Sequence, residues 1–271
     1  MYGINAPLGL IPQSSLTGAT WNNQTRAYEI NPAYATVISK GDPVKRLADG
    51  TIGVWNPATD AAVGILGIFQ ACFYLTNAPT VGNAVSAPYW PGVANVATGG
   101  NGFANTPQAL IVDDPEIVYS VQVSQSGTAG GVANPIVALG VTLAMFGCNI
   151  SFDNRNNVLA QNMGFATVFP STAAGTSYVP PNNPGPGTAA NNYQSGFYAD
   201  LNTMVGPGGG ATVVGKIVGF DKSTFVGQVP YTSVGPVQTG VFTNALVIIN
   251  NHVYKGGTGT IATGTAKTTG P

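Results

Sequence analysis

Charged residues are scarce in this sequence. Asp, Glu, Lys and Arg together make up 7% of its 271 residues, and the formal net charge is −1, whereas about 25% of the residues of an ordinary soluble domain are charged. The nine Lys and Arg residues form no basic run, which argues against nucleic acid as a partner. Hydrophobic residues make up 44% of the chain, too many for a globally disordered protein. A nearly uncharged surface does little to keep copies apart, so the composition favours a protein that packs densely in an assembly.

Cysteine and histidine are also rare. Cys72 and Cys148 lie far apart, each within an apolar run, which predicts two buried free thiols rather than a disulfide framework. His252 is the only histidine, and the sequence contains no Gly-x-Ser-x-Gly motif, so no pair of nucleophile and base is indicated. We expect His252 to be a hydrogen-bonded strand residue. The sequence therefore predicts no catalytic, cofactor-binding or metal-binding residue and a protein that is not an enzyme.

Long hydrophobic runs are absent as well. The longest apolar stretch, residues 61–75, is interrupted by Gln70 and is shorter than the about 18 to 20 residues that a membrane-spanning helix needs. No Lys or Arg precedes Arg26, so the charged region of a secretory signal is missing. We expect no membrane partner.

Short β-type runs separated by turn signals are what the sequence has in abundance, above all in residues 36–69. Gly41-Asp42-Pro43 predicts a turn, because proline fixes φ and the Asp side chain can bond its own backbone. Asp49-Gly50 is the strongest hairpin signal in the chain. It lies between the β-type runs 44–47 and 51–55, so we expect these two runs to pair as adjacent strands.

The rest of the sequence also favours strands, with one exception. Residues 61–75 are interpreted as a buried strand or a bent pair of strands, because their glycines disfavour a helix. The exception is residues 198–205, for which a short helix is predicted. Residues 171–194 are rich in Pro, Gly and Asn and predict a long exposed loop. Further strands are expected within residues 93–97, 110–112, 117–123, 135–150, 212–220, 224–229, 238–242 and 245–250.

These elements predict an all-β fold: a β-barrel or β-sandwich with jelly-roll-like or SH3-like elements and long Gly/Pro-rich loops. Residues 1–24 are apolar but cannot hold a helix, so we expect an extended N-terminal arm that lies on a neighbouring surface, or else a frayed terminus. Residues 25–255 are the all-β body, which can divide into two subdomains near residue 110. Residues 256–271 are a Gly/Thr-rich tail with little to pack.

Two sequence patterns resemble chemical sites. Asp113, Asp114 and Glu116 form the only carboxylate cluster; they can hold a metal ion or act as an acid and base, but turns also collect Asp for backbone reasons. Residues 206–210 have the glycine content of a phosphate loop. However, no Ser or Thr follows Lys216, so a plain loop is the better interpretation.

Two other patterns have ordinary explanations. Trp55 and Trp90 stand beside turn residues; each can stack on a sugar, but an aromatic residue beside a turn more often packs a corner. Residues 153–157 do not match a calcium loop, because Arg155 stands where an oxygen ligand belongs.

Four short patterns occur in order along the chain. The first is K-G-D-P-V at residues 40–44, followed by V-G-I-L-G-I-F at 63–69; the second is D-D-P at 113–115 before V-Y-S-V-Q at 118–122. The third is V-G-F-D at 218–221, and the fourth is L-V-I-I-N-N-H at 246–252. Together they span most of the chain and resemble the capsid decoration, or cement, proteins of tailed bacteriophages.

The resemblance implies an all-β virion protein, present in many copies on the outer surface of the capsid, where it bridges neighbouring subunits of the major capsid protein. It implies synthesis in the host cytoplasm, no cofactor and no catalytic motif. By analogy with the three-fold positions of capsid lattices, we expect a homotrimer, since closed symmetry is the usual arrangement of identical subunits.

Other classes of protein remain as alternatives. A phage tail or fibre protein usually shows a repeat or a coiled-coil segment, and neither is present. A secreted carbohydrate-binding β-module is expected to begin with a signal peptide. A hydrolase needs an acid or nucleophile pair, for which the sequence offers only the cluster around Asp113.

Overall fold

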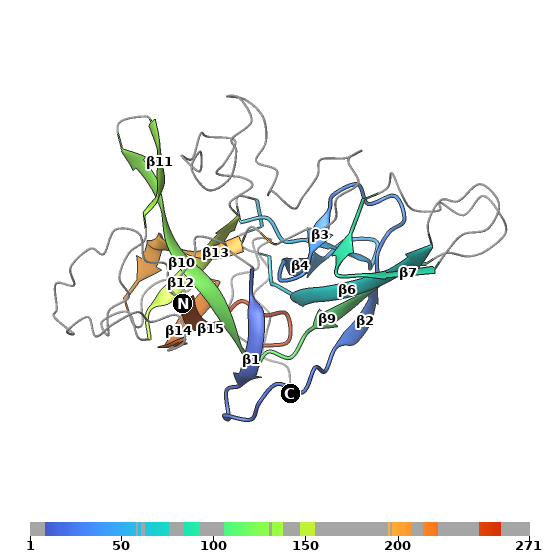
Figure 1. Ribbon diagram of the computed structural model, residues 1–271, viewed down its shortest axis with the longest axis horizontal. Coiled ribbons are helices and arrows are strands. Elements are labelled where there is room, and N and C mark those ends of the chain that lie inside the picture. The colour runs from blue at the N-terminus through green and yellow to red at the C-terminus, as the bar shows by residue number, and fades with distance from the viewer. Residues whose placement is uncertain are drawn as a thin grey trace.

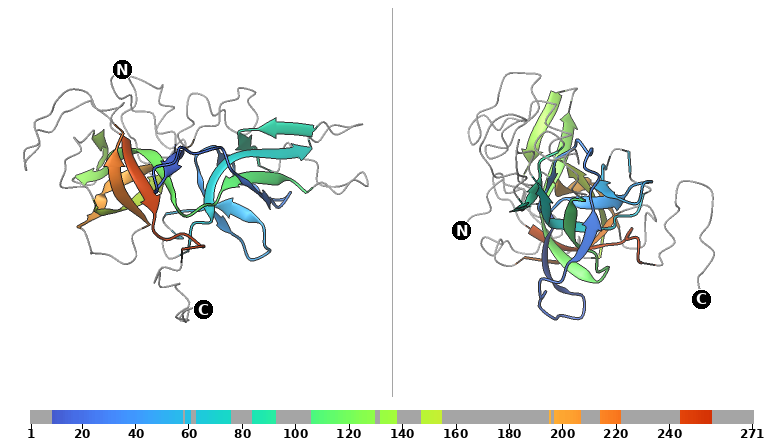
Figure 2. Two further views of the ribbon diagram at one scale, coloured as in Figure 1. Left: turned by 90° about the horizontal axis from the view of Figure 1, so that it is seen from below. Right: turned by 90° about the vertical axis from the view of Figure 1, so that its right-hand side faces the viewer.

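The computed structural model describes residues 9–57, 59–60, 63–75, 84–92, 106–129, 132–137, 147–154, 195, 197–206, 214–221 and 244–255. Every regular element in this part of the chain is a β-strand, so the predicted all-β class is confirmed. The strands form two lobes that lie side by side along the longest axis of the molecule (Figures 1 and 2). Among these residues, none belongs to a helix long and apolar enough to cross a lipid bilayer.

The first lobe is a closed barrel with two additional strands. The ring runs β10, β13, β12, β14, β15 and back to β10. Its strands are β10 (Ile117–Ala129), β12 (Asn149–Asn154), β13 (Phe197–Val205), β14 (Gly215–Phe220) and β15 (Asn244–Ile249). Outside the ring, β1 (Ile11–Ser15) and β11 (Val132–Val137) each pair with β10. The hairpin of β10 and β11 projects from the barrel (Figure 1).

Side chains that alternate along the barrel strands fill its interior. In β10, for example, Tyr119, Val121 and Val123 are almost completely buried in one cluster. This period of two is the pattern that a strand with one face toward the core requires. The other strands contribute Ile150, Phe152, Phe197, Ala199, Ile217, Ala245, Val247 and Ile249 to the same cluster.

The second lobe is a sheet in the order β2, β9, β6, β4, β5, with β7 paired to β6. The bounds are β2 (Arg26–Glu29), β4 (Pro43–Arg46), β5 (Ile52–Val54), β6 (Gly67–Leu75), β7 (Ala84–Ala87) and β9 (Gln108–Val112). A bridge between Ile30 and Ile52 joins the two ends of this sheet. A separate pair, β3 (Ile38–Ser39) and β8 (Tyr89–Trp90), completes the lobe.

The predicted hairpin at Asp49-Gly50 is confirmed. β4 and β5 pair antiparallel, and the Leu47 amide donates to the Thr51 carbonyl oxygen at 2.8 Å. Gly50 has φ +87°, which glycine adopts at no steric cost. Its amide donates to the Leu47 carbonyl oxygen at 3.0 Å, which closes the turn.

The two lobes share part of their hydrophobic core. Trp55 of the second lobe lies 6.4 Å, between ring centroids, from Phe197 of the barrel. Ile65 and His252 form a β-bridge between the lobes, and the Leu10 amide donates to the Gly41 carbonyl oxygen. The division of the body into two subdomains near residue 110 stays a prediction.

Residues 198–205 are strand, so the predicted short helix is wrong. They belong to β13, which pairs with β10 on one side and with β12 on the other. Phe197 and Ala199 fill the barrel core, and Tyr198 is also fully buried. Pairing on both sides overrides the local preference of the sequence, as tertiary context often does.

Part of the segment predicted as an arm lies within the described residues. Residues 11–15 form β1 and pair with β10 of the same chain, and the contact of the arm with a neighbouring surface stays a prediction. Residues 1–8 lie outside the described residues. The expected strands at 93–97, 224–229 and 238–242, the loop 171–194 and the tail 256–271 lie outside them as well.

Gly67 occupies a position where two strands come unusually close, and we expect Gly67→Ala to lower the free energy of unfolding by about 1 to 3 kcal/mol. A Cβ atom there would press against the Val112 carbonyl oxygen and lie 2.7 Å from Ile111 Cγ2. Gly206→Ala is the matched control, because its Cβ would meet nothing within 4 Å. Urea unfolding of both variants tests this expectation, and equal losses would contradict it.

Candidate interaction sites

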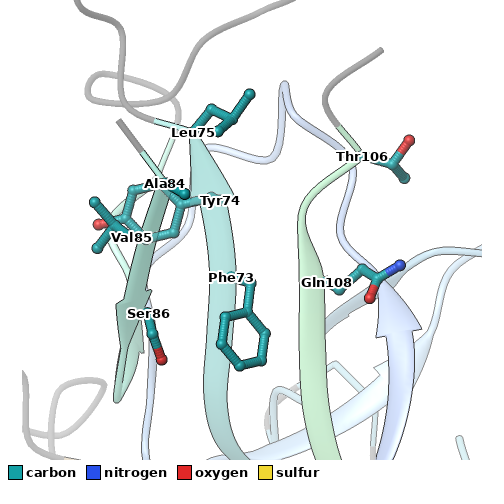
Figure 3. Close-up of a pocket in the computed structure, with 8 residues that line it drawn as sticks. All are labelled: Phe73, Tyr74, Leu75, Ala84, Val85, Ser86, Thr106 and Gln108. Carbon is teal, nitrogen blue, oxygen red and sulfur yellow. The ribbon is translucent and has the colours of Figure 1, made fainter. Parts of the chain in front are cut away.

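An uncharged groove lies at the end of the second lobe that points away from the barrel (Figures 1 and 3). Its volume is about 360 Å³, and it is formed by β6, β7 and the segment that leads into β9. The lining residues are Phe73, Tyr74, Leu75, Ala84, Val85, Ser86, Thr106 and Gln108. None of them is charged, so the groove offers apolar contact and hydrogen bonds rather than ion pairs.

Phe73 is the apolar anchor of this groove, with 47% of its surface exposed. Its neighbours along β6, Cys72 and Tyr74, are buried, which places Phe73 on the opposite, outer face of the sheet. Across the sheet it lies opposite Ser86 of β7 and Gln108 of β9, as Figure 3 shows. Among the described strands, β7 pairs only with β6, so within the described part of the chain its other edge has no strand partner.

A second, polar cleft of about 580 Å³ lies where the chain passes between the lobes. It combines the segment that enters β2, the turn between β9 and β10, and the turn after β15. We call it the junction cleft, and its lining residues are Gln24, Thr25, Arg26, Asp113, Asp114, Pro115 and Tyr254.

A chain of hydrogen bonds holds one wall of the junction cleft. The Tyr28 hydroxyl donates to Asp113 Oδ2 at 2.6 Å, and Arg26 Nη1 lies 2.9 Å from the same oxygen. The hydroxyl groups of Tyr28 and Tyr254 are 3.0 Å apart. Since the Tyr28 proton is directed to Asp113, Tyr254 is the donor in this last bond. Burial, followed by the bond to Asp113, raises the pKa of Tyr28, which keeps its hydroxyl protonated.

The carboxylate cluster around Asp113 serves the turn between β9 and β10. Asp114 Oδ1 accepts a hydrogen bond from the Glu116 amide at 2.8 Å, as Asp does in turns. Asp113 instead belongs to the wall described above. The described residues contain no group of three or more His, Cys, Asp and Glu side chains that could hold a metal ion.

His252 follows β15 and is 3% exposed. Its Nδ1 accepts a hydrogen bond from the Tyr254 amide at 3.1 Å, and its Nε2 has no hydrogen-bond partner among the described residues. Burial lowers the pKa of His252 to about 4; the positive charge of Lys255 acts in the same direction, whereas Asp113 and Asp114 oppose it. The imidazole is therefore neutral at pH 7.

The two cysteines and the two tryptophans highlighted by the sequence are structural. Cys72 and Cys148 are free and buried, as predicted, and burial raises the pKa of the Cys72 thiol to about 12. Trp55 and Trp90 are fully buried. Their indole N–H groups donate to backbone carbonyl oxygens of Asp60 and Val63, and of Tyr34, respectively. Neither tryptophan is available to stack on a sugar.

The glycine-rich pattern does not form a phosphate site in the described residues. Lys216 lies in β14 rather than at the start of a helix, and a helix N-terminus is what a phosphate loop requires. Residues 207–210 lie outside the described part of the chain, as do residues 155–157 of the rejected calcium pattern.

Sequence reasoning singled out Asp113 and Asp114 of the junction cleft, but not the other residues that shape the two sites. Phe73 lies within the predicted buried stretch, and only the alternation of residues 72–75 hints at an outward side chain. Arg26, Tyr28 and Tyr254 meet Asp113 through pairings between segments far apart in sequence. No local sequence pattern predicts these long-range contacts.

No family model, no curated protein and no solved structure matches this chain. The function is therefore argued from the residues and the geometry described above.

Proposed function

We propose that this protein is a non-enzymatic structural protein of a bacteriophage particle that decorates the capsid and stabilises it by bridging neighbouring major capsid protein subunits. The observation that carries the proposal is the uncharged groove around Phe73, next to the edge of β7 that has no strand partner among the described residues. Such a surface suits attachment to another protein better than it suits chemistry on a small molecule. The sequence resemblance described above points to the same class of protein.

Attachment at this groove relies on apolar burial and backbone hydrogen bonds. Burial of a Phe side chain contributes about 1.5 to 3 kcal/mol. A strand of the capsid protein added to β7 would contribute main-chain hydrogen bonds regardless of charge. Two cations of the second lobe already have contacts within the chain: Lys45 pairs with Asp60, and Arg46 lies over the Tyr28 ring.

A bridging protein needs two separate contact surfaces. The groove lies at one end of the long axis, and the barrel with the projecting hairpin of β10 and β11 lies at the other (Figure 1). We propose that the two ends contact different capsid subunits on the outer surface of the virion, and that the copies form a homotrimer. Light scattering on the purified protein tests the trimer, and a monomer at high concentration would contradict it.

We expect attachment to survive molar sodium chloride and to weaken in urea. Exposed ion pairs contribute about 0 to 1 kcal/mol each and less at high salt, whereas urea weakens apolar burial. The measurement is the amount of protein that stays on purified particles after each wash. Steep loss in salt that leaves the shell intact would show that charges dominate the interface.

Phe73→Ser tests the groove itself. We expect it to weaken binding to shells that lack the protein by about tenfold or more, since about 1.4 kcal/mol corresponds to a factor of ten. Val63→Ser is the matched control, because Val63 is 40% exposed and does not line the groove. Equal binding of both variants would contradict the groove as the attachment site. Failure of the unmodified protein to bind shells would contradict the proposed function.

A further inference from the structure

The junction cleft shares no lining residue with the attachment groove. It contains polar groups that hydrogen bonds hold in place before any ligand binds. Asp113 Oδ2 receives the Tyr28 hydroxyl and contacts the Arg26 guanidinium. This fixes the carboxyl group, and neither of these contacts uses Asp113 Oδ1. Groups held in place before a ligand arrives lose little conformational freedom on binding.

Tyr254 supplies an aromatic side chain at the same cleft. It is 47% exposed, although its hydroxyl is bonded to Tyr28 and its ring lies 5.8 Å, between centroids, from the ring of His252. An exposed aromatic ring anchored from behind differs from a surface side chain that moves freely. Tyrosine presents an apolar ring together with a polar tip, which suits a ligand with both C–H and O–H groups.

The charge pattern excludes several classes of ligand. A phosphate or sulfate would meet the carboxylates of Asp113 and Asp114, and the charge of Arg26 is already paired with Asp113. A metal ion would find no suitable group of ligands among the described side chains. A purely apolar molecule would shield the polar groups of the lining from water without offering them a hydrogen bond, which is costly.

We propose that the junction cleft binds a neutral saccharide. Its volume of about 580 Å³ lies within the range of small-molecule sites, about 300 to 1,000 Å³. The sugar ring packs on Tyr254. Its hydroxyl groups donate to the carboxylates of Asp113 and Asp114 and accept from Arg26 and Gln24.

This site goes beyond capsid attachment and gives the protein a second activity. A decoration protein with such a cleft can hold a particle against a surface rich in carbohydrate. Substitutions in the junction cleft are expected to leave attachment to the shell unchanged, so the two proposals fail independently.

The test is a titration of the full, isotope-labelled protein followed by the NMR signals of its backbone amides. The probes are glucose, galactose, mannose and N-acetylglucosamine, each added up to about 0.1 M, because a millimolar Kd corresponds to only about 4 kcal/mol. Sodium sulfate and calcium chloride are titrated separately as probes for an anion site and a cation site. We expect at least one sugar to produce saturable shifts at Thr25, Asp114 and Tyr254, and neither salt to do so.

Variants identify the contacts. Tyr254→Ala should weaken sugar binding by about tenfold or more, whereas Tyr254→Phe, which keeps the ring, should stay within about threefold of the original protein. Phe73→Ser, which removes an exposed aromatic residue elsewhere, should change nothing. If Tyr254→Ala does not fold, Gln24→Ala takes its place and should also weaken binding.

Three results would overturn the proposal. The first is that no sugar of the panel gives saturable shifts at the junction cleft. The second is saturable binding of sulfate or calcium there in preference to every sugar. The third is a folded Tyr254→Ala variant, or its Gln24→Ala replacement, that binds the sugar as well as the original protein does.

Discussion

Asp42→Asn is expected to change the free energy of unfolding differently at pH 8 and at pH 4. The change that the substitution causes should be more stabilising at pH 8 than at pH 4 by about 4 kcal/mol. Asp42 is buried in the turn before β4, where it accepts a hydrogen bond from the Ser39 amide at 2.8 Å. Burial raises its pKa to about 7, although hydrogen bonds from Ser195 and Ser39 oppose the rise. The difference between a pKa near 4 in the unfolded chain and about 7 in the folded protein corresponds to about 4 kcal/mol.

The direction follows from which state binds the proton more tightly. Because the folded protein holds the Asp42 proton at a higher pH than the unfolded chain does, this group stabilises the fold fully only below about pH 4. Its contribution falls as the pH rises toward 7 and is lost above that value. Asparagine does not ionise, and it can still accept the bond from Ser39 and donate one to Ser195.

The measurement is urea unfolding of the original protein and of Asp42→Asn between pH 4 and pH 8. Asp49→Asn is the control, because Asp49 is exposed and its pKa is lowered, first by the hydrogen bond from the Thr51 side chain. A difference between original protein and Asp42→Asn that stays constant with pH would show that Asp42 does not carry this proton.

Local signals predicted the parts of the fold that are determined locally. The hairpin between β4 and β5 follows from Asp49-Gly50, and the turn at Asp42 follows from Gly41-Asp42-Pro43. By contrast, β13 has no such signal. It is a strand because β10 and β12 flank it, and those pairings join segments that are far apart in the chain.

The candidate sites depend on the same kind of long-range information. The pairing of β2 with β9, with Arg26 opposite Ile111, brings Arg26 and Tyr28 beside Asp113. The turn after β15 then adds Tyr254. Periodicity predicts which residues form strands, but not which strands become neighbours, so Asp113 could be singled out from the sequence while its partners could not.

His252 is a second buried titratable group. Its effect on the pH dependence of stability is opposite in sign to that of Asp42. Its pKa is lowered from 6.5 to about 4 in the folded protein. The unfolded chain therefore binds the proton more tightly, and the stability that the neutral imidazole permits is lost as the pH falls from about 6.5 toward 4. The size of this loss is about 3 kcal/mol.

His252→Asn is expected to remove this loss on acidification. Asn can accept the hydrogen bond from the Tyr254 amide that His252 Nδ1 accepts at present, but it takes up no proton. The smaller side chain lowers stability at every pH, so the informative quantity is the slope of unfolding free energy against pH. Between pH 6.5 and pH 4, the free energy of unfolding of the original protein should fall by about 3 kcal/mol relative to that of His252→Asn.

Asp42 and His252 together should make the original protein nearly insensitive to pH between about 4.5 and 6.5, because acid strengthens one contribution while it weakens the other. Neither group is among the causes of the pKa shift of the other, so their effects should add. The free energy of unfolding of Asp42→Asn should then fall as the pH is lowered, and that of His252→Asn should rise. In the double variant it should change little with pH. Urea unfolding of all four proteins at pH 4.5, 5.5 and 6.5 tests this, and equal slopes in the two single variants would contradict it.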